Sequence, residues 1–192
     1  MAKLYFKYGA MGSSKTAQAL ITKFNYEEKG MRVLLLKPAV DTRDGAALVK
    51  SRIGLLSEAL VFNREENLFD IIRYNNVARC PNAVIIDEAQ FLTREQVEQL
   101  RMAADKESIS VLCFGLRTDF RIRLFEGSKA LFELADSISE IKSVCSCGNK
   151  ASVNARIDKE GKIITDGEQV DIGGNEKYVS MCYKCYRENC CK

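Results

Sequence analysis

The stretch Gly-Ala-Met-Gly-Ser-Ser-Lys-Thr, which starts at Gly9, has the residue types that bind phosphate. In such loops backbone N–H groups surround an anion at a helix N-terminus, a lysine reaches the β- and γ-phosphates, and a hydroxyl ligates Mg²⁺. Ser14 stands where the pattern has glycine, and serine is strained there if the backbone requires a positive φ. The residues expected to bind phosphate are Gly9, Ala10, Met11, Gly12, Ser13, Ser14, Lys15 and Thr16. The alternative is a strand–turn–helix with an incidental lysine.

A second reactive group follows an apolar stretch, Ala-Val-Ile-Ile, that ends at Asp87 and Glu88. A carboxylate at the carboxyl end of a buried strand lies where open α/β folds bind ligands. Asp87 suits a role in holding Mg²⁺ together with Thr16. Glu88 would point to the other side of the strand end, toward a substrate hydroxyl or water. The alternative, that both acids only lead into a helix cap, does not account for the phosphate loop upstream.

The cysteines gather at one end of the chain: of eight, six follow residue 144, and the chain has no histidine. The pairs Cys145/Cys147 and Cys182/Cys185 offer four thiolates, which suit a closed, structural zinc site. Free structural thiols are the alternative. Without zinc we expect the last ~50 residues to lose their fold, because so short a segment buries little core.

The overall composition is that of a globular protein with 192 residues, 46% hydrophobic and 29% charged. A net charge of +3 is too small to indicate a nucleic-acid partner. No leader-like segment is visible, and no apolar run approaches the roughly 18 residues that a membrane span needs. We therefore expect a cytoplasmic protein with neither a membrane nor a nucleic-acid partner.

The elements that must position these groups alternate along the chain. The expected strands are 4–8, 32–37, 83–87, 109–115 and 137–143. The expected helices are 16–28, 67–75, one that opens with the capping box Thr93–Gln96, and 129–136. The apolar face of the first helix is expected to comprise Ala17, Leu20, Ile21 and Phe24. This alternation predicts an α/β fold with a parallel sheet. A change of composition near Val144 divides the chain into a nucleotide-binding domain, 1–143, and a small zinc-binding domain, 144–192, with β-like pieces at 151–157 and 178–181.

Taken in order, the motifs resemble the thymidine kinases of the small zinc-containing type over nearly the whole chain. Besides the loop and the cysteine pairs, they are Lys37-Pro38 to Arg43, Asp87 to Phe91, Gly115 to Phe120, and Ile172-Gly-Gly174 followed by Tyr178. Departures from the family are Ser14 for glycine, Arg52 where many relatives carry histidine, Ile122 and Leu124 for a glycine and a proline, and the short first cysteine pair.

The resemblance implies a P-loop NTPase-like (RecA-like) fold and transfer of the γ-phosphoryl of ATP to the 5′-hydroxyl of thymidine, and of deoxyuridine. It implies Glu88 as the catalytic base and a homotetramer, with ATP, Mg²⁺ and structural Zn²⁺ as cofactors. Further nucleotide-binding residues would be Asp41, Thr42, Arg43, Asp87, Glu88, Ala89 and Gln90. Phe120 would pack on thymine, and a lasso-like loop with Gln169, Val170, Asp171, Ile172, Gly173 and Tyr178 would close over the nucleoside. Arg43, Arg117 and Arg121 are candidates for stabilising the transferred charge.

Two other functions remain open at this point. Asp-Glu-Ala-Gln is similar to helicase cores, which would suit a nucleic-acid-stimulated ATPase. Against it stand the small positive charge and the lack of a stacking-aromatic stripe. Ser14 motivates the third interpretation, a non-catalytic nucleotide-binding protein.

Overall fold

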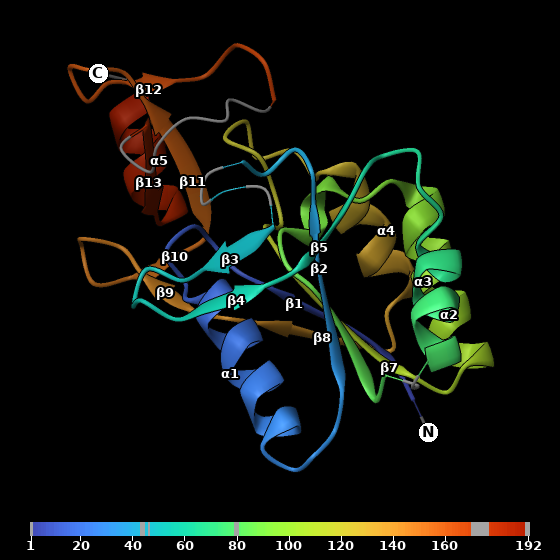
Figure 1. The fold of residues 1–192 in the computed structure, drawn as a ribbon. Coiled ribbons are helices and arrows are strands. Elements are labelled where there is room, and N and C mark those ends of the chain that lie inside the picture. Colours follow the sequence, from blue (N-terminus) through green and yellow to red (C-terminus); the bar gives the residue numbers. More distant parts are fainter. Residues whose placement is uncertain (1, 43–44, 46, 79–80, 170–176, 191–192) are drawn as a thin grey trace.

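The centre of the protein is a six-stranded sheet with strand order β5-β2-β6-β7-β1-β8 (Figure 1). The computed structural model describes residues 2–42, 45, 47–78, 81–169 and 177–190. The strands are β1 (Leu4–Tyr8), β2 (Val33–Pro38), β5 (Leu60–Phe62), β6 (Ala83–Ile86), β7 (Ser110–Gly115) and β8 (Ser137–Glu140). Every neighbouring pair is parallel, so the expected parallel sheet is confirmed.

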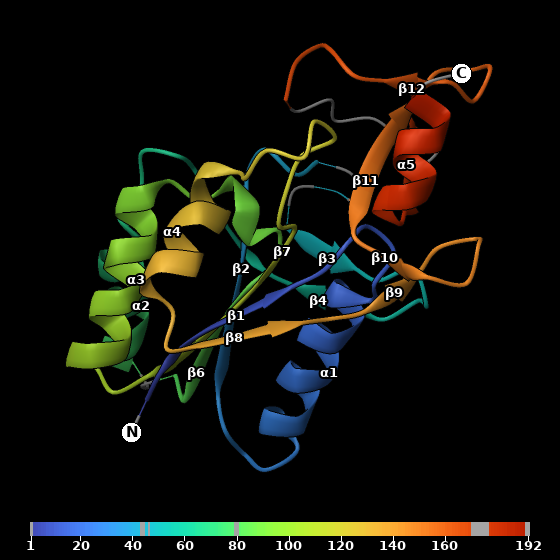
Figure 2. The ribbon, with the colours of Figure 1, turned by 180° about the vertical axis from the view of Figure 1, so that it is seen from behind.

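Helices cover both faces of this sheet (Figures 1 and 2). They are α1 (Lys15–Glu27), α2 (Leu68–Ala78), α3 (Arg94–Lys106) and α4 (Glu126–Leu134), with the short helix η1 (Ala89–Phe91) after β6. The helix α1 lies on one face, and α2, α3 and α4 lie on the other. The expected capping box is confirmed, because Thr93 and Gln96 bond reciprocally at the start of α3. At the start of α2, Asn67 accepts from the N–H of Asp70 at 3.1 Å.

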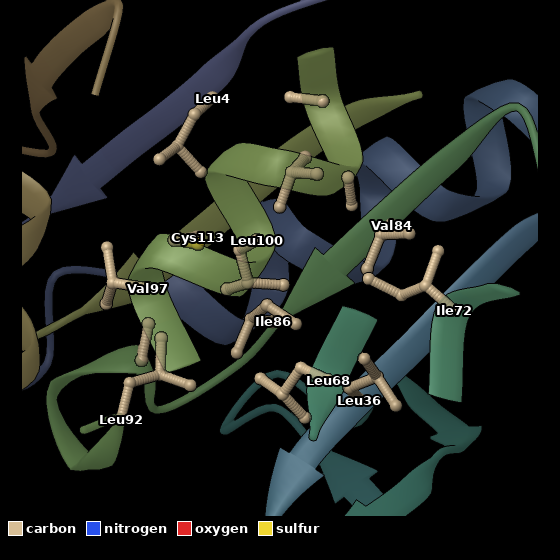
Figure 3. Packing of buried hydrophobic residues seen from close by; sticks show 14 of the residues in the cluster. Leu4, Leu36, Leu68, Ile72, Val84, Ile86, Leu92, Val97, Leu100 and Cys113 are labelled. Carbon is tan, nitrogen blue, oxygen red and sulfur yellow. The ribbon is translucent and has the colours of Figure 1, made fainter. Parts of the chain in front are cut away.

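Side chains alternate between the two faces along each buried strand, because successive residues point to opposite sides. In β6, Val84 and Ile86 face α2 and α3, where Figure 3 shows them with Leu68, Ile72 and Leu100. Ala83 and Ile85 belong to the opposite cluster, together with Ala19 and Leu20 of α1. A strand that is apolar on both faces is therefore covered on both, as a continuous apolar run predicts.

The prediction for the buried face of α1 is wrong at two positions. Ala17 and Leu20 are buried, but Ile21 is 46% and Phe24 62% exposed. Burial is confined to the first half of the helix, where small side chains allow α1 to pack closely on the sheet behind the phosphate loop. The helix α4 also begins earlier than expected, at Glu126.

The C-terminal part of the chain forms a three-stranded antiparallel sheet, β12-β11-β13, a separate antiparallel pair, β9-β10, and a helix beside the larger sheet (Figure 2). Its elements are β9 (Ser143–Val144), β10 (Lys150–Ala151), β11 (Val153–Ile157), β12 (Ile163–Ile164), β13 (Tyr178–Met181) and α5 (Tyr183–Cys190). The expected β-like pieces correspond to β11 and β13, whereas α5 and the hairpin of β3 (Leu48–Lys50) and β4 (Leu56–Glu58) were not predicted. Among the described residues, no helix combines the length and apolar character needed to cross a membrane.

Candidate active site

The phosphate loop leaves β1 and folds around the ammonium group of Lys15. This group is buried and donates to the carbonyls of Ala10 at 2.8 Å and Gly9 at 3.2 Å. The Oγ of Ser13 lies 3.4 Å from the same nitrogen. Gly9 must be glycine, because a Cβ there would come within 2.4 Å of the carbonyl oxygen of Ile141. The loop therefore concentrates a buried cation and a helix N-terminus at one point.

Ser14 adopts the backbone conformation that explains why the pattern has glycine there. Its φ of 63° and ψ of 25° are left-handed, and it directly precedes α1. Its side chain makes no capping hydrogen bond to α1 that would offset this strain. A second cation lies near the loop: the Nη1 of Arg52, from the turn between β3 and β4, is 3.5 Å from where a Cβ on Gly12 would be.

A contact between side chains joins the acidic end of β6 to the phosphate loop. The hydroxyl of Thr16 lies 3.5 Å from Oδ1 of Asp87. Burial and the adjacent charge of Glu88 raise the pKa of Asp87 to about 7, although the hydrogen bond from Thr16 and the charge of Lys15 act in the opposite direction. A hydroxyl beside a buried, poorly solvated carboxylate fits a hard divalent cation such as Mg²⁺, which would hold that carboxylate ionised.

Glu88 is held at the end of β6 by the side chain of Gln90. The Nε2 of Gln90 donates a short hydrogen bond to the carboxylate of Glu88, and its Oε1 accepts from the N–H of Leu116 at 2.9 Å. The close approach requires glycine at 115, since a Cβ there would lie 2.9 Å from Oε1 of Gln90. Ala89, beside it in η1, is fully buried. Gln90 thus orients the carboxylate that the sequence predicts to be catalytic.

Asp41 lies at the end of β2 and is paired with Lys37 of that strand. Both side chains are buried, and the Nζ of Lys37 lies 3.4 Å from Oδ2 of Asp41. Lys37 also donates to the carbonyls of Gly45 at 3.2 Å and Leu48 at 2.9 Å, so it holds the β3–β4 hairpin against the sheet. Thr42 is exposed nearby, and Arg43 lies outside the described residues.

The predicted nucleoside side lies between β7 and the C-terminal sheet. The ring of Phe120 is 1% exposed, and the guanidinium of Arg156 lies 3.9 Å from its centroid. Arg156 donates to the hydroxyl of Tyr178 at 2.6 Å. The Nε2 of Gln169 donates to Asp119 at 3.1 Å. A base that packs on Phe120 must use its other face or displace Arg156. The predicted residues Val170, Asp171, Ile172 and Gly173 lie outside the described residues.

Two of the three candidate arginines have structural partners. Arg117 donates to the carbonyl of Ser152 at 3.2 Å, and Arg121 lies 3.5 Å from the carboxylate of Asp119. Sequence reasoning missed Arg156, which joins the expected base-packing ring to the expected lid tyrosine. Nothing local distinguishes this arginine in sequence, because its role depends on how β11 is placed against the loop after β7.

The two cysteine pairs come together as expected. The sulfur atoms of Cys145, Cys147, Cys182 and Cys185 all lie within 4.8 Å of one another. Backbone N–H groups lower the pKa of Cys145 to about 6, while hydrogen bonding with Cys147 raises the pKa of Cys185 to about 12. The 3.6 Å between Sγ of Cys147 and Cys182 is close to the ~3.8 Å edge of a tetrahedron with 2.3 Å zinc–sulfur bonds. The four thiols can therefore hold a metal ion.

Comparisons with known proteins agree with these observations. The sequence pattern of the family "Thymidine kinase" matches residues 2–186. A thymidine kinase of Aliivibrio fischeri is 50% identical over 188 residues, which cover 98% of each chain. One of Salmonella choleraesuis is 49% identical over 98% of this chain and 92% of its own. The Legionella pneumophila ATPase DotB matches 78% of this chain and 43% of its own at 19% identity, with a TM-score of 0.39, which is too low to support an argument. On the family match and the identities, the chain belongs to the thymidine kinase family.

Proposed function

We propose that this protein transfers the γ-phosphoryl group of ATP to the 5′-hydroxyl of thymidine, with deoxyuridine as a second acceptor. The observation that carries the proposal is the contact between Thr16 and Asp87. It joins the phosphate loop to the acidic strand end, with Glu88 next to it. The loop for the triphosphate and the carboxylate of Glu88, which would act on the 5′-hydroxyl of thymidine, are then adjacent, as phosphoryl transfer requires.

On the nucleotide side, the triphosphate occupies the loop from Gly9 to Thr16, and Lys15 neutralises its charge in place of the carbonyls that it now contacts. Thr16 and Asp87 hold Mg²⁺, which supplies further charge neutralisation when bound. The segments 41–43 and 87–90 complete this side. Arg52 is the described arginine that lies against the loop, so we add it to the candidates for stabilising the transferred charge.

On the nucleoside side, Glu88 orients the 5′-hydroxyl and accepts its proton as the new bond forms. Phe120 packs on the base, and the segment 169–173 with Tyr178 closes over it. Two contacts support this lid: Gln169 bonds directly to Asp119 of the loop that carries Phe120, and Tyr178 bonds to Arg156, whose guanidinium lies over the Phe120 ring. A closed lid keeps water from the phosphoryl group.

We further propose that the metal of the cysteine cluster is Zn²⁺, because four thiolates leave no open position and suit a structural site. We also propose that residues 144–192 form a domain distinct from 1–143, and the cysteine cluster supports this division. We also propose the cytoplasm as the place of action, because cysteines that bind a metal must stay reduced and this compartment keeps thiols reduced. The exposed Ile21 and Phe24 on α1 support a homotetramer, which light scattering of the purified protein tests.

The experiment for the main proposal is ATP-dependent phosphorylation of radiolabelled thymidine. Lys15→Ala should lower the rate by about 100-fold or more. Lys23→Ala is the matched control, because Lys23 lies on the same helix and pairs only with Glu27 among the contacts described. ATP hydrolysis stimulated by single-stranded DNA without thymidine phosphorylation would favour the ATPase, and ATP binding without turnover would favour the non-catalytic protein.

A further inference from the structure

A buried asparagine on β11 contacts both loops of the site at once. Asn154 is 4% exposed. Its Oδ1 accepts from the N–H of Met11 at 2.7 Å, and its Nδ2 donates to the carbonyl of Thr118 at 3.1 Å. Both ends of the amide are therefore used, and each bonds to backbone rather than to a movable side chain.

The two partners belong to the loops that bind the two substrates in the proposed function. Met11 lies in the phosphate loop after β1, and Thr118 lies two residues before Phe120 in the loop after β7. The strands β1 and β7, which precede these two loops, are neighbours in the sheet. At their carboxyl ends, the N–H of Gly9 donates to the carbonyl of Gly115 at 3.2 Å. Asn154 provides a second connection, further out along both loops, where the ligands would bind.

We propose that Asn154 is a positioning residue, which fixes the distance between the phosphoryl donor and the nucleoside acceptor. The inference rests on the proposed function. Phosphoryl transfer depends on in-line placement more than on covalent chemistry, and a misplacement of about 1 Å can cost about 100-fold in rate. A planar amide has a donor and an acceptor at a fixed separation, so it sets the spacing of two backbone groups.

The chemistry of the position favours an amide over other polar groups. An aspartate would keep an acceptor for Met11 but would place a carboxylate oxygen against the carbonyl of Thr118 and add negative charge beside a triphosphate. An apolar side chain would leave one N–H and one carbonyl without their present partner, and a buried polar group without a partner is unfavourable. The structure thus assigns Asn154 a defined part in the geometry of the reaction, although it need not touch either substrate.

The test compares wild type, Asn154→Ala and Asn154→Gln by steady-state kinetics and by equilibrium binding of each substrate alone. Asn154→Ala should lower kcat by about 10- to 100-fold. The dissociation constants for ATP without thymidine, and for thymidine without ATP, should change by less than about threefold, because each loop still binds its own ligand. Asn154→Gln keeps the amide but on a side chain longer by one methylene, so its kcat should lie between the values for wild type and Asn154→Ala.

The control is Asn82→Ala, which removes an exposed asparagine that accepts from the N–H of Arg32 at 2.8 Å, far along the sheet. It should leave kcat unchanged. A kcat of Asn154→Ala within about twofold of wild type, or a loss explained wholly by weaker binding of one substrate, would overturn the inference. If Asn154→Ala does not fold, the same comparison of kcat and dissociation constants is made for Asn154→Gln. If neither variant folds, the role of Asn154 is structural only and the inference is overturned. The wild-type rate separately tests the proposed function.

Discussion

Replacing Ser14 by glycine should stabilise the protein. Ser14 has a φ of 63°, and the left-handed conformation costs a residue with a Cβ roughly 1–2 kcal/mol. Glycine removes that strain but has more freedom to lose on folding, which costs roughly 0.5–1 kcal/mol. The difference is a gain of about 0.5–1 kcal/mol.

The assay is thermal unfolding followed by circular dichroism, at fixed zinc concentration and without nucleotide. For a chain of this size, 1 kcal/mol corresponds to about 2–4 °C, so we expect Tm to rise by about 1–4 °C. Urea unfolding should show a higher midpoint with an unchanged slope, because the surface exposed on unfolding is the same.

Two further serines make the comparison sharp. Ser108 also has a positive φ, 54°, in an exposed turn away from the site, so Ser108→Gly should stabilise by a similar amount. Ser57 lies in the extended strand β4, where glycine relieves nothing, so Ser57→Gly should destabilise by roughly 0.5–1 kcal/mol. A lower Tm for Ser14→Gly alongside a higher one for Ser108→Gly would refute the strain argument at the loop.

Three other changes test the remaining contacts. Arg156→Ala should raise the KM for thymidine by about 10-fold, the equivalent of about 1.4 kcal/mol, because the guanidinium that holds the Phe120 ring and Tyr178 in place for a base on the other face of the ring is lost; unchanged steady-state kinetics would contradict this. Cys145→Ser should lower the zinc content and the Tm together, measured by metal analysis and calorimetry, and a full complement of zinc would exclude the four-thiolate site. Lys37→Met should destabilise by about 3 kcal/mol in urea, because Asp41 loses its buried ammonium partner, and adding Asp41→Leu should restore part of the loss, since the carbonyls of Gly45 and Leu48 still lack their donor. No recovery in that double variant would count against the ion-pair explanation.

All strands of the central sheet except the edge strand β5, and most helices, were predictable because their signals are local. A strand such as β6, apolar at every position, must be covered on both faces, and the capping box at Thr93 places the start of α3. The burial of α1 was not predictable from periodicity, because Ile21 and Phe24 continue the apolar spacing of the helix but remain exposed. A periodic pattern identifies a helix, but the close approach of its first half to the sheet decides which side chains are covered.

The placement of the site residues was predictable where one segment carries them, as at Lys15, Asp87 and the cysteine pairs. The supporting contacts were not. Arg156 lies over Phe120 and Asn154 bonds to Thr118, each 36 positions earlier in the chain, and these contacts follow from the placement of β11 against the loop after β7. The strain at Ser14 was predictable only in part. The phosphate-loop pattern has glycine at this position, but the positive φ angle itself is known only from the folded loop.

The most direct test of the central claim is the turnover of Glu88→Gln. Glutamine has nearly the same shape and can still bond to Gln90, but it cannot accept the proton of the 5′-hydroxyl. We predict that kcat for thymidine phosphorylation falls by about 10²- to 10⁴-fold while ATP and thymidine still bind. A variant that phosphorylates thymidine at the wild-type rate would contradict the assignment of Glu88 and the mechanism built on it.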